Sequence, residues 1–304
     1  MPRSGESRMT EQEEGDVVLT SSLLRRWPLP APSGDKNAKG RVLVVGGGSQ
    51  TPGAILLAAE AALRVGAGKL QMATVDTTAP LLSTAVPEAF VAGLPVSRTG
   101  DISPAAADII LDLAGSADAV LLGPGVTDPD AATLLLERVV PHLDTRVVVD
   151  ALGMAYLTAH PQGLAHLRGR AVLSPNSGEL GRTLGLGSDE VEADLHAATA
   201  RLARESGAVV LSGSSISYIV TPDGKTWRNE AGGPGMAASG SGDVKAGAVV
   251  GLLARGAEPE QAAAWGAFVH GRAGERLTAA VGRVGFLARE LVTELPRVLA
   301  EVEV

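Results

Sequence analysis

Short runs of apolar residues alternate along the chain with longer segments whose apolar residues recur at helical spacing. The strand-like runs are 41–45, 69–75, 119–122, 146–149 and 171–173. The helical segments are 54–65, 104–113 and 129–139. Strands of this length alternating with helices are typical of a mostly parallel sheet covered on both faces. The pattern predicts an α/β fold.

The C-terminal half adds a hairpin and a group of helices. Strands are predicted at 208–212, 214–220 and 225–229, and Thr221-Pro222-Asp223-Gly224 has strong turn chemistry. Helices are predicted at 244–255, 259–277 and 287–304. No linker or change of composition divides the chain after residue 41, so we expect one domain over 17–304. Residues 1–16 are polar and acidic, which predicts a disordered tail.

Glycine-rich turns follow several of these strands. Gly46-Gly47-Gly48 follows the first strand and precedes a helix, an arrangement that places ligands at the carboxyl end of a parallel strand. A dinucleotide-binding Rossmann fingerprint would need a third glycine where Thr51 stands, and Pro52-Gly53 interrupts the approach to the helix. The spacing therefore argues against a Rossmann site.

The strongest candidate for chemistry is the glycine-rich stretch 235–243, which leads into an apolar helix that we expect Asp243 to open. The first amides of a helix have no partner within it, so a loop without large side chains lets phosphate oxygens reach them. The carboxylate of Asp243 would then lie beside the reacting group. The alternative interpretation is an ordinary helix start capped by Asp.

Composition and charge exclude several other classes of function. The chain has no cysteine, which excludes disulfides and thiolate chemistry, and its net charge of -8, without a cluster of Lys or Arg, argues against a nucleic-acid partner. No apolar run approaches the roughly 18 to 20 residues that cross a bilayer, so we expect no membrane partner and a cytoplasmic protein. The five histidines lack metal-ligand spacing and are expected to cap or decorate helices, so no protein metal site is predicted. Glu179 is expected to cap the turn at Ser177 rather than approach a cation.

The order of these segments resembles the ADP- or ATP-dependent NAD(P)H-hydrate dehydratases of the ribokinase-like superfamily. The matching motifs are Gly46-Gly47-Gly48, Pro52-Gly53-Ala54, Gly66-Ala67-Gly68, Pro87-Glu88, Gly123-Pro124-Gly125, Ser174-Pro175 with Gly178-Glu179, and Gly235-Met236-Ala237 with Gly240, Gly242 and Asp243. The resemblance covers about residues 17–300. It implies a three-layer αβα sandwich with a mostly parallel central sheet.

The resemblance also implies an activity and a set of site residues. Members of the family use ADP or ATP, with Mg²⁺, to phosphorylate the hydroxyl of NAD(P)H hydrate, and elimination of phosphate restores NADH or NADPH. By this likeness, Ala54, Gly125 and Asn176 contact the hydrate. The expected nucleotide-binding residues are Ser212, Gly213, Ser214, Ser215, Ile216 and Gly242. Asp243 contacts the hydrate and is the expected base. A homo-oligomer and a separate NAD(P)H-hydrate epimerase are implied partners.

Three positions depart from the family. Asn176 stands where the family usually has His, Ser212 where it has Lys, and Val148 where it has Asp. Asn after Ser-Pro is typical of the sugar and vitamin kinases of the superfamily, so a small-molecule kinase remains an alternative, as does a nucleotide-binding protein without turnover. Without a lysine at position 212, nucleotide binding is expected to be weak unless another cation compensates. The candidates are Lys36, Lys39 and, preferred for its place after the glycine loop, Lys245.

Overall fold

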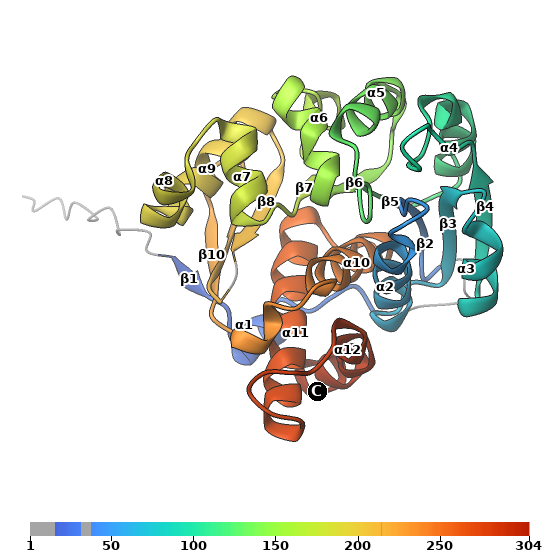
Figure 1. Ribbon diagram of the computed structural model, residues 1–304. Helices are drawn as coiled ribbons and strands as arrows, with labels where there is room; N and C mark the ends of the chain where they lie inside the picture. The colour runs from blue at the N-terminus through green and yellow to red at the C-terminus, as the bar shows by residue number, and fades with distance from the viewer. Residues whose placement is uncertain (1–15, 32–37, 214, 304) are drawn as a thin grey trace, which may run out of the picture.

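The computed structural model describes residues 16–31, 38–213 and 215–303, and in this range every strand belongs to one sheet. The strand order is β1-β10-β9-β8-β7-β6-β5-β2-β3-β4 (Figure 1). The predicted tail falls almost entirely outside the described residues, and Ser214 is also outside them.

The strands from β8 to β4 run parallel, and a short antiparallel hairpin extends the sheet beyond β8. In sheet order, the bounds are β1 Val17–Val18, β10 Thr226–Asn229, β9 Ser217–Val220, β8 Val209–Gly213, β7 Ala171–Leu173, β6 Arg146–Val149, β5 Ala119–Leu122, β2 Arg41–Val45, β3 Lys69–Val75 and β4 Ala89–Leu94. β1 pairs in parallel with β10, so the first and the last strand in chain order are neighbours at one edge of the sheet.

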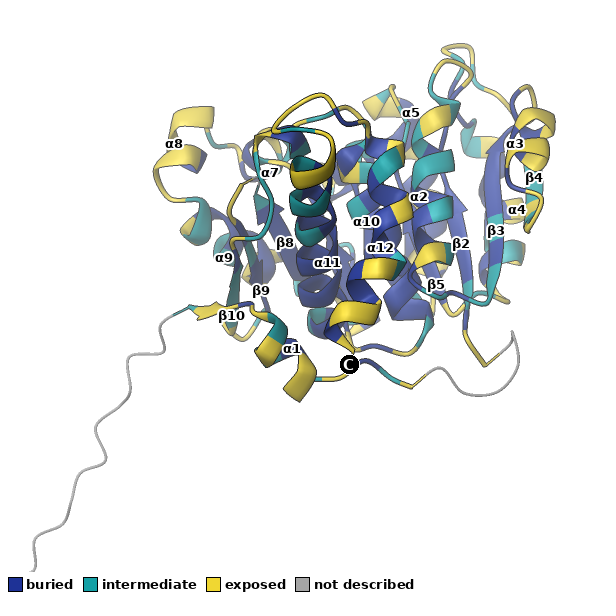
Figure 2. Cartoon of the chain, turned by 90° about the horizontal axis from the view of Figure 1, so that it is seen from below, coloured by how far each residue is buried: buried dark blue, intermediate teal, exposed yellow. Residues whose placement is uncertain are grey.

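Helices cover both faces of the sheet, which makes the three layers visible in Figure 1. One face carries α4 Ala107–Ala114, α5 Pro129–Val139, α6 Met154–Ala159, α7 Ser177–Leu184, α8 Ser188–Ala193 and α9 Leu195–Ser206. The opposite face, seen in Figure 2, carries α2 Pro52–Arg64, α10 Ser241–Ala254, α11 Pro259–Ala280 and α12 Ala288–Val302. Two short helices, α1 Ser21–Arg26 and α3 Ala79–Ala85, lie beside α12 and β4. The predicted three-layer αβα architecture is confirmed.

The central strands are buried because both of their faces are covered. Val42, Leu121 and Val148 point toward α2 and α10, whereas their neighbours along each strand point toward α4–α9. Small residues let the helices of the first group approach closely. A Cβ atom at Gly247 of α10 would lie 2.1 Å from the carbonyl oxygen of Ala58 in α2, so a side chain there would force the two helices apart. This contact fixes the start of α10 beside the start of α2.

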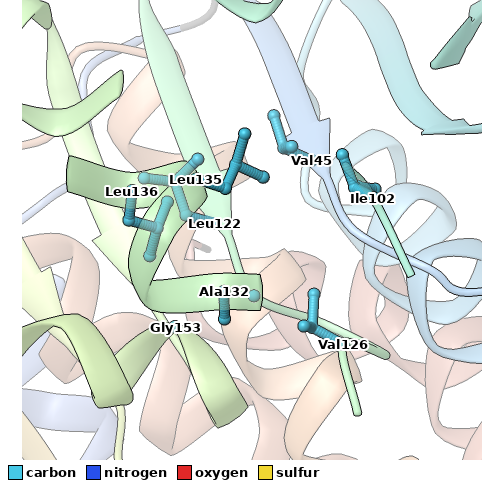
Figure 3. Close-up of a pocket in the computed structure, with 9 residues that line it drawn as sticks. Val45, Ile102, Leu122, Val126, Ala132, Leu135, Leu136 and Gly153 are labelled. Carbon is cyan, nitrogen blue, oxygen red and sulfur yellow. The ribbon is translucent and has the colours of Figure 1, made fainter. Parts of the chain in front are cut away.

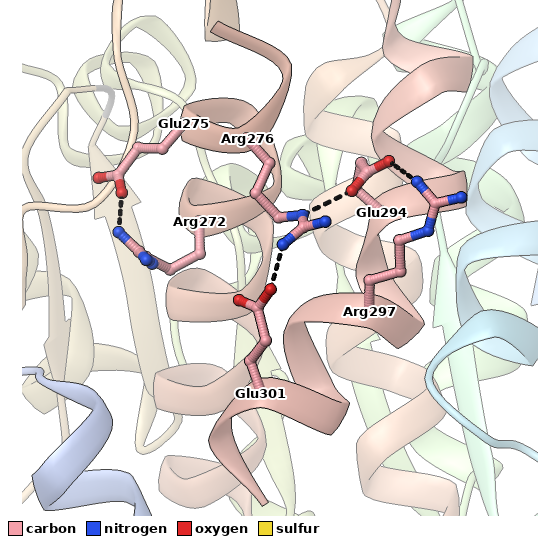
Figure 4. A network of polar contacts seen from close by, with 6 residues as sticks. All are labelled: Arg272, Glu275, Arg276, Glu294, Arg297 and Glu301. Atoms are coloured by element: carbon pink, nitrogen blue, oxygen red, sulfur yellow. Dashed lines mark hydrogen bonds and ion pairs between the residues drawn. The ribbon is translucent and has the colours of Figure 1, made fainter. Parts of the chain in front are cut away.

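Ion pairs hold the C-terminal helix against its neighbour (Figure 4). The carboxylate of Glu294 in α12 lies 2.7 Å from Nε of Arg276 in α11 and 2.5 Å from Nη1 of Arg297, and its side chain is almost fully buried. Arg276 also pairs with the half-exposed Glu301. Apolar side chains of α12, including Leu291 and Leu295, belong to the same hydrophobic cluster as the buried residues of α11.

The structure corrects several predicted boundaries. Pro52 does not separate the glycine turn from the helix predicted at 54–65. It occupies the first position of α2, where a missing amide hydrogen costs nothing. Asp243 does not open α10, which begins at Ser241 after a left-handed Gly240 with φ 87°. The hairpin strand expected from 214 begins at Ser217. The remaining predicted strands and helices are present within a few residues.

Some elements were not predicted. The edge strand β4 and the short helix α3 were missed, as were α6 to α9, which cover the face opposite α10. None of the helices in the described part of the chain combines the length and apolar character needed to span a bilayer.

Candidate functional site

A cavity of about 280 Å³ opens at the carboxyl ends of β7 and β8, between the start of α10 and the middle of α11. Its polar lining includes Asn176, Ser215, Ser241, Lys245 and His270. A second cavity, drawn in Figure 3, lies between β2, β5 and α5. It measures only about 20 Å³ and is lined by apolar residues such as Val45, Leu122 and Leu135, so it is a packing defect of about one water rather than a ligand site.

The first turn of α10 supplies donors to the larger cavity. Gly240 adopts a left-handed conformation that turns the chain into the helix, and Gly242 lines the cavity. Among the described residues, none accepts a hydrogen bond from the amide of Gly242 or of Asp243. A side chain at Gly242 would meet open space, so the approach to these amides is clear. Two free amides at the positive end of a 14-residue helix form a suitable site for a phosphate.

Two other glycine turns meet beside the start of α2. The amides of Gly47 and Gly48 donate to the carbonyl oxygens of Pro124 and Gly125, at 2.7 and 3.1 Å. Gly125 is left-handed with φ 70°, and a Cβ atom there would lie 2.9 Å from the Cβ of Ala54. The predicted hydrate contacts Ala54 and Gly125 are therefore neighbours in space.

Gly240 connects this second region to Asp243. A Cβ atom at Gly240 would lie 2.5 Å from Cδ1 of Leu57 in α2 and 3.9 Å from Oδ2 of Asp243. Leu57 lies one turn after Ala54 in α2, and Gly242, next to Asp243, lines the cavity. Asp243 therefore belongs to a turn that packs against α2 and borders the cavity through Gly242.

The buried carboxylate of Asp101 contacts both glycine turns. Asp101 is only 2% exposed, and its Oδ2 accepts hydrogen bonds from the amides of Thr127 and Asp128 and from the hydroxyl of Thr127. Its Oδ1 lies 2.3 Å from where a Cβ of Gly48 would stand, so position 48 has no room for a side chain. Asp101 thus ties the segment that follows Gly125 to the turn that follows β2.

Three acidic side chains gather where β6, β7 and α10 meet, and they perturb one another. Burial raises the pKa of Asp150 well above its ordinary value, and the charges of Asp243 and Glu179 raise it further. Burial likewise raises the pKa of Glu179. Burial and then the charge of Glu179 raise the pKa of Asp243 to about 6. A carboxyl group with a pKa close to neutrality is well suited to accept a proton.

The cations and neutral donors of the site come from α10 and α11. Lys245 lines the cavity, and among the described residues its ammonium forms no hydrogen bond or ion pair. Burial lowers its pKa, while the charges of Asp150 and Glu179 oppose this shift. His270 is 8% exposed, and burial, followed by the charge of Lys245, lowers its pKa to about 3. Lys245 is therefore the charged donor of the cavity and His270 a neutral one.

The donor set also fits a magnesium ion carried by a nucleotide. No group of three or more His, Cys, Asp or Glu side chains within the described residues is placed to hold a metal by itself. Burial raises the pKa of both Asp150 and Glu179, and the charges of Asp243 and Glu179 raise the pKa of Asp150 further, so a bound divalent cation would favour the ionised form of these carboxyls. Mg²⁺ prefers oxygen ligands and keeps several waters, so one or two of these carboxylates suffice when phosphates supply the rest.

The predicted nucleotide residues fall into two groups. Gly213, Ser215 and Gly242 line the cavity, and so does Asn176, which was predicted to contact the hydrate. Ser212 does not: it is fully buried, and its hydroxyl donates to the carbonyl oxygen of Pro175 at 2.9 Å. Ile216 is 41% exposed and is also absent from the lining, and Ser214 lies outside the described residues.

Two departures from the family acquire a structural meaning. The oxygen of Asn176 caps α7 by accepting from the amide of Glu179, and the Glu179 carboxylate accepts from the amide of Asn176, both at 2.9 Å. The predicted capping role of Glu179 is thus confirmed, and only the NH₂ of Asn176 remains to meet a ligand. Val148 is fully buried on the α10 side of β6 and extends the apolar core.

Sequence reasoning missed or misplaced three residues. Asp101 carried no signal because its partners lie 26 and 27 positions further along the chain. Asp150 directly follows the predicted strand 146–149, and nothing in that pattern distinguishes it from an ordinary turn residue. His270 was expected to cap or decorate a helix, but it lies inside α11 and contacts the first residue of α10. The helical spacing of 259–277 could not reveal that contact, because Ser241 reaches it from another element.

A mostly parallel αβα sandwich with a glycine-rich helix start, a nearby carboxylate and a cation at the strand ends defines a nucleotide-dependent enzyme of the ribokinase-like class. The solved structures agree. The ADP/ATP-dependent NAD(P)H-hydrate dehydratase of Bacillus subtilis, co-crystallised with ATP and Mg²⁺, has a TM-score of 0.78 at 24% identity over 95% of this chain and 99% of its own. The same enzyme co-crystallised with ATP and Mg²⁺ and soaked with CoA has a TM-score of 0.75 at 25% identity, with the same coverage.

The particular family follows from the sequence comparisons. The profile of the NAD(P)H-hydrate dehydratases matches residues 42–297. The ADP-dependent (S)-NAD(P)H-hydrate dehydratase of Xanthomonas campestris is 42% identical over 283 residues, which are 93% of this chain and 96% of that protein. The bifunctional NAD(P)H-hydrate repair enzyme of Escherichia coli is 33% identical over 97% of this chain, which spans 54% of that longer protein. The chain belongs to the NAD(P)H-hydrate dehydratase family. The resemblance noted in the sequence is confirmed.

Proposed function

We propose that this protein uses ADP or ATP, with Mg²⁺, to dehydrate the 6-hydroxy hydrate of NADH or NADPH. The hydroxyl oxygen attacks the terminal phosphorus of the nucleotide, and the bond from that phosphorus to the leaving oxygen breaks. The hydroxyl proton passes to the protein. The carbon–oxygen bond then breaks with loss of a ring proton, which releases inorganic phosphate and restores the double bond of the reduced nicotinamide.

The position of Asp243 carries this proposal. Asp243 belongs to the turn of α10 that packs against Leu57, one turn after Ala54 in α2. In this proposal the Ala54–Gly125 surface holds the hydrate, and the amides of Gly242 and Asp243, which have no acceptor among the described residues, hold the phosphates. The base and the anion site therefore belong to one helical turn, so a hydroxyl could lose its proton while the amides hold the transferred group. Bound Mg²⁺ would offset phosphate charge, held by Asp150 or Glu179.

Lys245 supplies the positive charge for the nucleotide in this proposal. Position 212 faces Pro175 and carries no charge, whereas Lys245 lines the cavity. Lys39 is less suitable, because it precedes Gly40, which packs against Ala254 at the far end of α10. That end is about 20 Å from the glycine turn, at 1.5 Å per residue. Lys36 lies outside the described residues.

The decisive experiment follows nicotinamide absorbance while the purified protein is incubated with NADH hydrate and either ADP or ATP. We expect absorbance to return only when nucleotide and Mg²⁺ are both present, with one phosphate released for each NADH formed. Consumption of nucleotide with a sugar or vitamin alcohol, but not with the hydrate, would instead identify a small-molecule kinase. Binding of both ligands without turnover would identify a protein that has lost catalysis.

The same proposal extends to partners and location. An asymmetric site of this kind can accept one epimer at the hydroxylated carbon, and the Xanthomonas relative is named for the S form. We therefore expect a separate NAD(P)H-hydrate epimerase to supply that epimer from the other. A cytoplasmic location and a homo-oligomeric state remain predictions from the sequence.

A further inference from the structure

His270 is a buried polar residue whose place in the fold the proposed reaction does not explain. It lies in the middle of α11, among small residues that include Ala267 and Gly271, and its imidazole borders the cavity. Nε2 of His270 lies 3.0 Å from Oγ of Ser241, the first residue of α10. Both side chains are less than 9% exposed, so this hydrogen bond is protected from competing water.

The surroundings of His270 keep it uncharged. Burial and the neighbouring ammonium of Lys245 both disfavour the imidazolium form, so the ring stays neutral throughout the physiological range. A neutral imidazole can hold the Ser241 hydroxyl without adding a second positive charge next to Lys245. Its role in this place is therefore geometric, since it does not titrate where the enzyme works.

We propose that His270 is a positioning residue that fixes the phosphate-binding turn of α10 through its hydrogen bond to Ser241. Ser241 immediately precedes Gly242 and Asp243, whose amides have no acceptor among the described residues. The turn itself is pliable, because it contains Gly240 and Gly242 and its N-cap makes no side-chain hydrogen bond. A fixed Ser241 keeps both amides directed into the cavity before a ligand arrives, which reduces the ordering cost of binding.

This inference rests on the proposed function only in naming the ligand as an adenine nucleotide. It is tested by ADP binding to the whole protein, measured by calorimetry in the presence of Mg²⁺. We expect His270→Ala and Ser241→Ala each to weaken ADP affinity about 5- to 10-fold, as expected for one lost hydrogen bond. The double variant should be no weaker than either single variant, because both changes remove the same contact.

A conservative variant separates positioning from mere packing. Gln offers an amide at about the reach of Nε2, so His270→Gln should recover most of the ADP affinity lost in His270→Ala and should keep the same dependence on pH. The KM for the hydrate should change less than twofold in all three single variants. Recovery by Gln would not occur if the imidazole only filled space.

Gln261 offers a matched control on the same helix. Its side-chain NH₂ donates to the carbonyl oxygens of Trp27 and Pro28, about two and a half turns from His270. Gln261→Ala should lower Tm about as much as His270→Ala does, but it should leave ADP affinity unchanged. Additive losses in the double variant, or normal ADP affinity in His270→Ala, would overturn the inference. A wild-type protein that binds ADP but does not turn over the hydrate would contradict the proposed function and leave this inference standing.

Discussion

Asp243 owes its chemical suitability to its neighbours rather than to its own side chain. The same carboxyl on an exposed helix start would ionise near its ordinary pKa of 3.8, whereas here burial and Glu179 raise the pKa to about 6. A base of this strength is ionised at neutral pH and still accepts a proton readily. Its charge is therefore retained at a cost to folding stability, which is a common property of catalytic groups.

We expect Asp243→Asn to keep nucleotide binding but to lower kcat about 10²- to 10⁴-fold, the usual contribution of a positioned base. In the wild type, kcat/KM should rise as pH increases through about 6, because the base must lose its proton. Steady-state kinetics from pH 5 to 8 test both statements. Near-normal turnover in the Asn variant would remove Asp243 from the mechanism.

The same substitution should stabilise the ligand-free protein. Because the pKa is higher in the folded than in the unfolded state, the wild type loses stability as pH rises from about 4 to above 6. The Asn variant lacks this loss, which amounts to at most about 3 kcal/mol for a shift of roughly two units. Thermal melts at pH 4.5 and 7.5 should show the advantage of the variant at pH 7.5. An equal difference at both values would mean that Asp243 is not destabilised by burial.

Lys245, rather than residue 212, is expected to supply the positive charge for the nucleotide. Lys245→Ala should weaken ADP binding roughly tenfold, which corresponds to one charge-assisted hydrogen bond. Ser212→Ala is the control, and it should leave ADP affinity unchanged because that hydroxyl is bound to Pro175. An unchanged calorimetric affinity for ADP in Lys245→Ala would place the phosphates elsewhere.

At the scale of elements, α10 contributes to both the core and the site. Its residues from Val244 onward are mostly buried, and Gly247 lets it lie directly on α2, so the position of its first turn is set by packing. Helices α11 and α12 complete this layer, and α11 carries His270. The ion pairs between α11 and α12 therefore stabilise the helix that borders the cavity.

We expect Glu294→Ala to lower the free energy of unfolding by about 1.5 to 3 kcal/mol, because it leaves Arg276 without its buried partner. Glu301→Ala is the matched control: this half-exposed carboxylate contacts the same arginine, and its loss should cost no more than about 1 kcal/mol. Denaturant unfolding measures both values. Equal effects would show that burial of Glu294 adds nothing to the pair.

At the scale of the whole molecule, ligand binding should be visible as stability. The cavity combines free amides with a lysine and acidic groups, so ADP and Mg²⁺ together should bind the folded state far better than the unfolded one. ADP at about 100 times its dissociation constant should add about 2.7 kcal/mol to the free energy of unfolding. Mg²⁺ alone should add much less, because no group of three or more His, Cys, Asp or Glu side chains in the described part of the chain is placed to hold it. A melt unchanged by Mg²⁺ and ADP would exclude nucleotide binding.

The sequence by itself determined the α/β class, the order of most strands and helices, and the glycine turns, since each depends on local periodicity or on a short motif. It also predicted Asp243 as the base, and that role stays a prediction. Only the tertiary structure decided that Ser212 faces Pro175 instead of the cavity, that Asp101 braces two glycine turns, and that His270 reaches Ser241. Such contacts join residues between 26 and 37 positions apart. Their side chains meet because strand order and helix packing bring those segments together. The spacing of apolar residues within one segment predicts neither the strand order nor the helix packing.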